Sequence, residues 1–257
     1  MTTPKISIKG LTKSFGEKNV LNGVDLDVAP GRSLVVIGPS GAGKSVLLKC
    51  VLGLIEPDAG AIEIDGVDLM RLSPRKRAAA TREIGMLFQG AALFDSLPVW
   101  ENVAFRLIYA ERAEAAAARE RANGCLGAGG LDAKVGDLFP AELSGGMQKR
   151  VGLARAIAAS PDVLFFDEPT TGLDPIMADV INGLIVERVR AAGATAISIT
   201  HDMTSARRIG DEIAMFYDGR IVWRGPPDAL EASGEPLVDQ FVNGRADGPI
   251  KMALRAD

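Results

Sequence analysis

One short stretch constrains this chain more than any other: residues 38–45 read GPSGAGKS and fit the phosphate-binding pattern G-x-x-x-x-G-K-[ST]. The apolar, β-branched run from Leu34 to Ile37 precedes it and predicts a buried strand. A predicted helix follows, because apolar residues recur at helical spacing at Val46, Leu47, Leu48, Val51 and Leu52. The order strand, glycine loop, helix makes a plain glycine turn with a solvated lysine the weaker interpretation.

This stretch predicts a nucleotide site built from backbone and side chains together. Glycines let backbone N–H groups approach phosphate oxygens without a Cβ in the way, and the helix N-terminus adds its dipole. Lys44 is expected to reach the outer phosphates, and the Ser45 hydroxyl is expected to hold Mg²⁺. The residues assigned to the nucleotide here are Gly38, Pro39, Ser40, Gly41, Ala42, Gly43, Lys44, Ser45 and Val46.

Composition limits the class of protein. With 257 residues, of which 47% are hydrophobic, the chain can form one large α/β domain or a core with an inserted subdomain. The net charge of -4 argues against a nucleic-acid partner, since such proteins are usually basic. Cys50 and Cys125 form no C-x-x-C pair and are interpreted as small core residues in a reducing compartment.

The sequence shows neither a signal peptide nor an apolar run of the roughly eighteen residues that a spanning helix needs. We therefore expect a soluble chain whose membrane role, if any, depends on a partner.

Two adjacent carboxylates follow a predicted buried strand. The run from Val163 to Phe166 is apolar and ends in Asp167 and Glu168. Burying carboxylates is costly unless they are used, and successive strand side chains point to opposite faces. One carboxylate can therefore hold Mg²⁺ while the other addresses a different point. A structural ion pair is the weaker alternative, because the same chain carries a phosphate loop.

Polar residues end two further predicted strands. Gln89 follows Met86 to Phe88, and His201, the one histidine of the chain, follows a β-rich run. Ligands of α/β sheets bind at the carboxyl ends of strands, and a neutral imidazole can both donate and accept a hydrogen bond. Phe15, in the loop expected between the first two strands, offers a face for an adenine ring, with a core or edge role as an equal alternative.

Several alternating stretches predict an antiparallel sheet beside the nucleotide core, at Ile6 and Ile8, at Val24, Leu26 and Val28, and at Ile62 and Ile64. Residues 71–82 are basic and are interpreted as a solvated helix rather than a partner-binding patch. Near the C-terminus we expect a hairpin over 213–223, a helix opened by Pro226-Pro227-Asp228, and a peripheral tail after Phe241.

Residues 91–159 are interpreted as a helical insertion. The stretch from Ala104 to Arg121 is rich in helix-forming residues, and glycines are expected to end it at Gly124, Gly127, Gly129 and Gly130. A second helix is expected to start at Leu143 to Met147, with Ser144 as its N-cap. Serine and glycines at a helix start can bind an anion, and a plain capped helix is the alternative.

In this order the motifs resemble those of the ATP-binding subunits of ATP-binding cassette (ABC) transporters, over nearly the whole chain. The matches are residues 38–45 with Walker A, Gln89 with the Q-loop, 143–147 with the signature, 163–168 with Walker B, 172–174 with the D-loop, and His201 with the switch histidine. Phe15 stands where the family places its adenine-stacking aromatic residue. Walker A alone would leave kinases, GTPases and helicases open.

The resemblance implies an α/β fold: a P-loop NTPase (RecA-like) core with an antiparallel β subdomain and an inserted α-helical subdomain. In this single ABC ATPase domain, residues 1–90 and 160–240 would form the core with its β subdomain, 91–159 the helical subdomain and 241–257 a C-terminal tail. Two departures from the family pattern stand out. Met147 replaces the usual Gln of the signature, and the D-loop begins with Thr171-Gly172 where Ser-Ala is common.

Within the family, the chain is similar to the ATPases of the maintenance-of-lipid-asymmetry (Mla) phospholipid transporters, also described as toluene-tolerance proteins. This closer likeness rests on GKSVLLK at 43–49, FDSLPVWENVAF at 94–105, LSGGMQKRVGLARAIA at 143–158, GLDPI at 172–176 and VNGRADGPI at 242–250.

The family implies that ATP is held between two subunits arranged head to tail. Lys44 would contact the β and γ phosphates, while Ser45, Asp167 and Gln89 would hold Mg²⁺. Glu168 would activate the attacking water, and His201 would hold the γ-phosphate and the water. Four residues complete the nucleotide site: Ser144, Gly145 and Gly146, which would donate to ATP on the partner subunit, and Asp174 of the D-loop.

The family also implies the partners. These are a second copy of the chain and multi-span permease subunits, with a small regulatory subunit and a periplasmic lipid-binding protein as further members. The chain would lie at the cytoplasmic face of the bacterial inner membrane and energise phospholipid movement between the inner and outer membranes. The alternatives are a transporter for another substrate and a soluble ABC ATPase such as the iron–sulfur assembly type. Neither substrate nor direction is readable from the sequence.

Overall fold

Within residues 3–81 and 84–251, the part of the chain that this computed structural model describes, six strands form a central sheet in the order β10-β9-β3-β8-β7-β6. Neighbouring strands run parallel except β9 and β10, which form an antiparallel hairpin as expected. The strands are β3 (Ser33–Ile37), β6 (Ile84–Leu87), β7 (Val163–Asp167), β8 (Thr195–Ile199), β9 (Glu212–Tyr217) and β10 (Arg220–Gly225).

Both faces of the central sheet are covered, which explains its apolar strands. Every residue of β3 and of β8 is buried, as is typical of parallel strands packed between two layers. Side chains alternate along β7, so Phe165 joins the apolar cluster that contains α1 (Lys44–Val51), and Phe166 joins the one that contains α6 (Pro175–Ala192). Replacing either phenylalanine with alanine is expected to cost about 3–5 kcal/mol.

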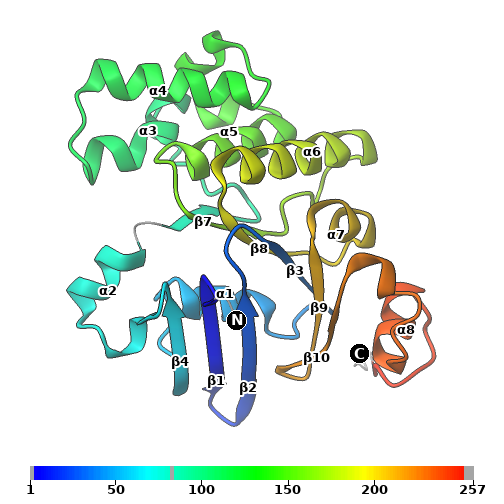
Figure 1. Ribbon diagram of the computed structural model, residues 1–257. Helices are drawn as coiled ribbons and strands as arrows, with labels where there is room; N and C mark the ends of the chain where they lie inside the picture. The colour runs from blue at the N-terminus through cyan, green and yellow to red at the C-terminus, as the bar shows by residue number, and fades with distance from the viewer. Residues whose placement is uncertain (1–2, 82–83, 252–257) are drawn as a thin grey trace.

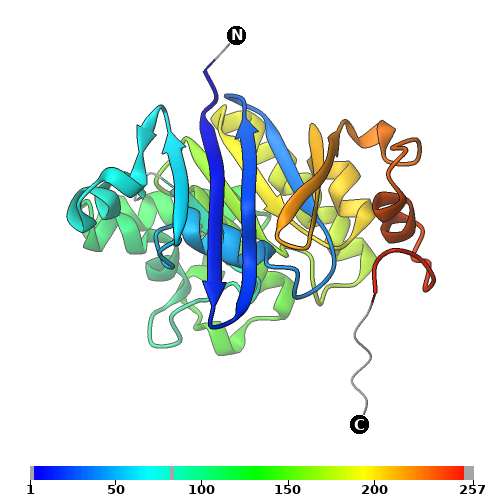
Figure 2. The same cartoon turned by 90° about the horizontal axis from the view of Figure 1, so that it is seen from below.

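The expected antiparallel sheet is present. Its described strands, in the order β2-β1-β4-β5, are β1 (Ile6–Phe15), β2 (Lys18–Val28), β4 (Ala59–Ile64) and β5 (Val67–Asp68). Inward residues such as Ile6, Ile8 and Val24 pack in one cluster with Leu47 and Leu48 of α1. Figure 2 shows β1, β2 and β4 side by side with α1 behind them. The antiparallel sheet therefore covers α1, which in turn covers the central sheet (Figure 1).

A separate helical part lies on the opposite side of the central sheet (Figure 1). It contains α3 (Val99–Tyr109), α4 (Ala115–Ala128) and α5 (Gly145–Ile157), with 3-10 turns η3 (Ala133–Asp137) and η4 (Pro140–Glu142). Its own apolar cluster includes Val103, Leu126 and Val151. The expected helix over residues 104–121 is in fact divided between α3 and α4.

The expectation that Gly124 and Gly127 end a helix is wrong, because both lie inside α4. Each glycine is exposed and has open space around it. The opposite face of α4 buries Ala118, Ala122 and Leu126. A helix-interior glycine costs about 1 kcal/mol relative to alanine, and this packing outweighs the cost.

The C-terminal segment is more firmly attached than expected. It contains α7 (Met203–Ile209), η5 (Pro227–Ala229) and α8 (Pro236–Val242), so Pro226-Pro227 opens only a 3-10 turn. Ile250 is buried against the α6 side of the core. The Gln240 side chain accepts from Ile250 N at 2.6 Å and donates to Ile250 O at 3.1 Å. The tail is therefore docked as far as this residue.

Three smaller expectations are also settled. The basic run at residues 71–82 lies in η1 (Leu69–Arg71) and α2 (Pro74–Ala80) as far as it is described. No residue of α2 is buried, which confirms the predicted solvated helix. Arg82 lies outside the described residues. Both cysteines are free and buried, and burial raises the pKa of Cys50 to about 11. Phe15 is the last residue of β1 and pairs with Lys18, so it belongs to a strand and not to the loop.

Among the described helices, none is both long and apolar enough to cross a bilayer.

Candidate functional site

The loop between β3 and α1 has the backbone that its glycines allow. Gly38, Gly41 and Gly43 have φ angles of 150°, 75° and 110°. A Cβ on Gly38 would lie 2.2 Å from the carbonyl oxygen of Phe216, and one on Gly43 would lie 2.8 Å from Val20. Only glycine fits at these two positions, because the loop packs directly against β9 and β2.

Lys44 begins α1 and buries its ammonium group in the curve of this loop. Nζ donates to the carbonyl oxygen of Gly38 at 2.7 Å and to that of Pro39 at 2.9 Å. Burial lowers the pKa of Lys44, and the nearby Glu168 and Asp167 partly oppose this shift. Since both hydrogen-bond partners are neutral, the positive charge stays available to a phosphate oxygen.

Ser45 and Asp167 join α1 to the end of β7. The Ser45 hydroxyl donates to Oδ1 of Asp167 at 3.3 Å. Burial raises the pKa of Asp167, while the Ser45 hydrogen bond and the nearby lysines Lys49 and Lys44 oppose that rise. A hydroxyl and a carboxylate at this distance are the hard oxygen donors that Mg²⁺ prefers.

Glu168 and His201 come together where β7 and β8 end. Asp167 and Ile199 are register partners in these parallel strands, so the residues that follow each of them are neighbours. Nδ1 of His201 lies 3.0 Å from Oε1 and 2.9 Å from Oε2 of Glu168. A carboxylate only accepts, so Nδ1 carries the proton of this bond; Nε2 accepts a hydrogen bond when the ring is neutral and donates one when the ring is protonated.

The backbone of Glu168 is strained, as is common at functional sites. Its φ is 49°, in the left-handed region that non-glycine residues rarely adopt. Its N–H donates to the Ile199 carbonyl at 2.9 Å, and the Thr171 hydroxyl donates to Oε2 at 2.9 Å. The sequence marked Thr171 only as a departure from the family pattern and gave it no role toward Glu168. Thr171 and His201 therefore both hold the carboxylate, at the sheet edge where β7 and β8 end.

Gln89 follows β6 and is exposed. No hydrogen bond within the described ranges joins its side chain to Ser45 or Asp167, so the expected metal role of Gln89 stays a prediction. Its carbonyl oxygen accepts from the buried Lys149 ammonium of α5, which also donates to the Glu168 carbonyl at 3.1 Å. One side chain of the helical part thus holds both the loop after β6 and the loop after β7.

Lys149 carries no motif of its own, yet helical spacing could have identified it. It lies four residues before Leu153 and seven before Ala156, on the stripe of α5 that is buried. Burial lowers the pKa of Lys149, and the carboxylates of Asp167 and Glu168 oppose the shift. A charged residue on a buried stripe is costly unless it is paired, which marks Lys149 as a positioning residue.

The signature segment has a different character. Ser144 caps α5, its Oγ accepting from Met147 N at 3.3 Å, which confirms the predicted N-cap. Ser144 and Gly145 are exposed, and a Cβ on Gly145 would meet open space. No described hydrogen bond joins residues 144–146 to the phosphate loop. The structure therefore leaves this segment on the surface of the helical part.

The remaining candidates are placed as follows. Asp174 caps α6 by accepting from Ile176 N at 3.0 Å and Met177 N at 3.1 Å, a structural use that the sequence did not suggest. Phe15 is 49% exposed, and the Lys13 ammonium lies 5.5 Å from the centroid of its ring. Ser40 and Gly41 are exposed at the tip of the loop, while Ala42 and Val46 pack against the core.

Comparisons with known proteins agree on the family of this chain. A family model described as "ABC transporter" matches residues 21–171. The chain is 40% identical to the probable ribonucleotide transport ATP-binding protein mkl of Mycobacterium leprae (strain TN), over 98% of this chain and 72% of that protein. It is 37% identical to the intermembrane phospholipid transport system ATP-binding protein MlaF of Escherichia coli (strain K12), over 95% of this chain and 91% of that protein.

The fold also matches solved structures of ATP-binding cassettes. The ATP-binding cassette MJ0796, in a dimeric post-hydrolysis state bound to ADP and Pi, superposes with a TM-score of 0.80 at 32% identity. The match covers 86% of this chain and 98% of that one.

Proposed function

The chain belongs to the ABC transporter family, and on that premise we propose how its residues hydrolyse ATP and which transporter they serve. It is the ATP-binding subunit that energises a transporter, and such cassettes act as dimers with membrane permease subunits. The observation that carries the proposed mechanism is the Glu168–His201 pair, which lies at the same sheet edge as Lys44 and Ser45.

Ser45 and Asp167 fit a magnesium ion that is shared with the nucleotide. Within the described residues there is no group of three or more His, Cys, Asp or Glu side chains that could hold a metal alone. Mg²⁺ commonly takes one or two protein oxygens and completes its shell with phosphate oxygens and water. We assign Ser45 and Asp167 as those protein ligands, with Gln89 completing the set. When bound, the ion would neutralise charge on the transferring phosphate.

Hydrolysis in this proposal uses three side chains, Lys44, Glu168 and His201. Lys44, on leaving its loop carbonyls, binds the β and γ phosphates. Glu168 accepts the proton of the attacking water, and His201 holds the γ-phosphate with the water. The strained backbone of Glu168 and its bonds to Thr171 and His201 keep the base oriented before substrate arrives.

The rest of the ATP site comes from a second copy of the chain. Ser144, Gly145 and Gly146 stand at the N-terminus of α5, where backbone N–H groups and the helix dipole favour an anion. We propose that they donate to the γ-phosphate of the ATP held by the partner subunit. Asp174 would lie where the two subunits meet, and Phe15 would stack on the adenine ring of ATP. Loss of the bridging phosphate then loosens the dimer, and the permease responds to that change.

We propose phospholipid as the cargo, moved between the inner and outer membranes of a bacterium from the cytoplasmic face of the inner membrane. Support comes from the names of the Escherichia coli and Haemophilus influenzae relatives, whereas the mycobacterial relatives are named for ribonucleotide transport, which makes that the second candidate. A small regulatory subunit and a periplasmic lipid-binding protein would complete the assembly.

The permease contact is proposed at residues 94–100. There Phe94 is 43% exposed, and its ring stacks on that of Phe105 with centroids 4.4 Å apart. Tyr109, which is 56% exposed, extends the same aromatic surface. An exposed aromatic cluster of this kind suits a protein interface.

Purification of the tagged chain from membranes, followed by lipid extraction, tests the cargo. We expect a multi-span membrane protein together with phospholipid above the level recovered with a Phe94→Asp control. Co-purified ribonucleotide would favour the second candidate, and recovery of no membrane protein would favour a soluble ABC ATPase.

A further inference from the structure

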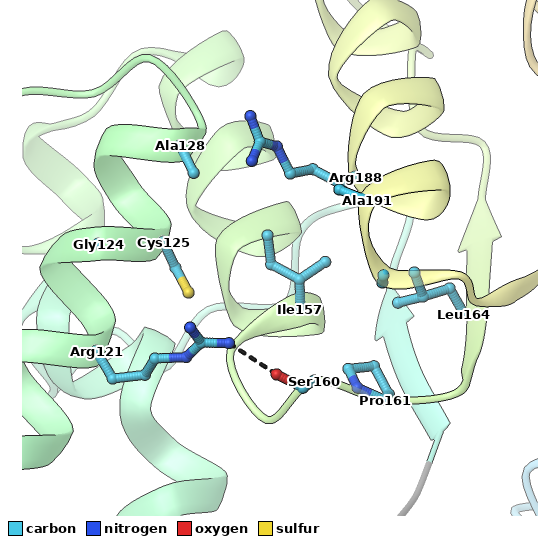
Figure 3. A pocket seen from close by; sticks show the side chains of 11 residues that line it. Arg121, Gly124, Cys125, Ala128, Ile157, Ser160, Pro161, Leu164, Arg188 and Ala191 are labelled. Carbon is cyan, nitrogen blue, oxygen red and sulfur yellow. Dashed lines mark hydrogen bonds between the residues drawn. The ribbon is translucent and has the colours of Figure 1, made fainter.

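We propose that a pocket between α4 and α6 binds a small oxyanion that carries an apolar group, such as an aryl phosphate. The pocket has a volume of about 230 Å³. Its walls come from α4 and the end of α5 in the helical part, and from β7 and α6 in the core (Figure 3). None of the described residues that line it is assigned to the nucleotide, so the site is separate from the proposed ATPase mechanism.

Two guanidinium groups enter this pocket from different elements. Arg121 reaches it from α4 and Arg188 from α6 (Figure 3). Of the described lining residues, none carries a carboxylate. Burial raises the pKa of the Cys125 thiol between them, while Arg121 and Arg188 both oppose that rise, so both charges act on the same space. Arg121 has only neutral hydrogen-bond partners among the described residues, and Arg188 pairs with the exposed Glu187 outside the pocket lining, so an anion within the pocket would be attracted by both charges.

A structural role explains only one of these arginines. Arg121 donates from Nε to the Ala158 carbonyl at 2.9 Å and from Nη2 to the Ser160 hydroxyl at 2.8 Å, so it caps the end of α5. Arg188 donates from Nη2 to the exposed Glu187 at 2.5 Å. Its Nε is buried and has no partner among the described residues. Buried donors are rarely left unpaired, so Arg188 has a hydrogen bond to offer.

The chemistry of the ligand follows from these walls. Guanidinium groups bind phosphate, sulfate and carboxylate oxygens through paired N–H donors. Ile157, Leu164 and Ala191 supply an apolar surface beside them, which suits an organic group better than a bare hydrated ion. A ligand here would join the helical part to the core through Arg121 and Arg188.

Nuclear magnetic resonance of the arginine Nε–Hε groups tests the site in the full chain. The protein is kept saturated with ADP and Mg²⁺ so that the phosphate loop is occupied, and phenyl phosphate is added at constant ionic strength. We expect the Arg188 signal, identified by its loss in Arg188→Gln, to shift saturably with a dissociation constant of about millimolar. Arg190→Gln is the matched control, because it removes the same charge from an exposed position on the same helix.

In calorimetry under the same conditions, Arg188→Gln should weaken phenyl phosphate binding at least about tenfold, and Arg190→Gln should leave it unchanged. If Arg188→Gln does not fold, the NMR titration of the wild-type protein decides whether phenyl phosphate binds, because the arginine Nε–Hε signals are observed there directly. Inorganic sulfate should bind more weakly than phenyl phosphate. Equal affinity would overturn the proposal that the ligand carries an apolar group. A signal that does not shift, or equal weakening in both variants, would overturn the site.

Discussion

The phosphate-loop region and the signature region of this chain are built in opposite ways. In the phosphate-loop region, Lys44, Ser45, Asp167, Glu168 and His201 each have partners inside the chain, and Lys44 is buried. In the signature region, residues 144–145 are exposed, and the side-chain hydrogen bond that Ser144 makes to another described residue is a helix cap. The side chains of the first region are paired within one chain, whereas the second region faces solvent, as the proposed head-to-tail dimer requires. Variants that act on one region alone test this difference.

The largest effect is expected from Glu168→Gln in the phosphate-loop region. The amide keeps the shape of the side chain but cannot accept the proton, so turnover should fall about 10²- to 10⁴-fold while ATP binding persists. Dimer should accumulate with ATP, because the bridging phosphate stays in place. Phosphate release and size-exclusion chromatography measure both effects. Glu187→Gln, at an exposed site, is the control, and normal turnover in Glu168→Gln would remove Glu168 from its role.

A smaller but still large loss is expected from Lys44→Ala. Without the ammonium group, ATP affinity should fall about 100-fold, equivalent to about 3 kcal/mol, because a charge-assisted contact to phosphate is lost. A fluorescence titration with a labelled nucleotide measures it. Lys49→Ala, on the exposed side of the same helix, should bind normally. Unchanged affinity in Lys44→Ala would refute the assignment.

The signature region is tested by Ser144→Arg. The bulky cation should block approach of a second subunit, so turnover should fall about tenfold or more while one chain still binds ATP. Ser73→Arg is the matched control, since Ser73 stands at an exposed helix N-cap without a side-chain hydrogen bond. If Ser144→Arg turns over normally, the two regions do not meet across a dimer.

Lys149→Met tests the link between the regions, because Lys149 belongs to α5 but holds the loops at Gln89 and Glu168. We expect a stability loss of about 1–3 kcal/mol and a few-fold decrease in kcat with little change in KM. Lys134→Met, at an exposed position of the helical part, is the control. Urea unfolding and steady-state kinetics measure the two effects, and a change in stability with unaltered kcat would contradict a positioning role.

The smallest expected effect is a pH dependence of the stability that Lys149 contributes. Burial lowers the pKa of Lys149 in the folded chain below its ordinary value of 10.5. At pH values between the folded pKa and the ordinary pKa, the unfolded chain therefore binds more protons than the folded chain. The free energy of unfolding of the wild type, relative to Lys149→Met, should therefore rise as pH increases through that window. Urea titrations at several alkaline pH values measure the slope. Parallel curves for the two proteins would contradict it.

Much of the fold and of the candidate site was predictable because it is encoded locally. The phosphate loop, the strand before Asp167 and the Ser144 cap each depend on residues adjacent in the chain. The uninterrupted α4 across Gly124 was not predictable, because packing of its opposite face decides it. The docking of Ile250 on Gln240 likewise joins residues that no local pattern relates.

The sequence by itself determined the candidate chemistry of this protein: which residues are proposed to bind phosphate, supply oxygen ligands and accept a proton. Spacing along the chain determined these, since a strand, a turn and a helix N-terminus need only neighbouring residues. Tertiary structure alone decided which groups meet. Parallel pairing of β7 and β8 brings Glu168 to His201, and burial of one face of α5 brings Lys149 to both loops, because sheet register and side-chain packing join residues far apart in the chain.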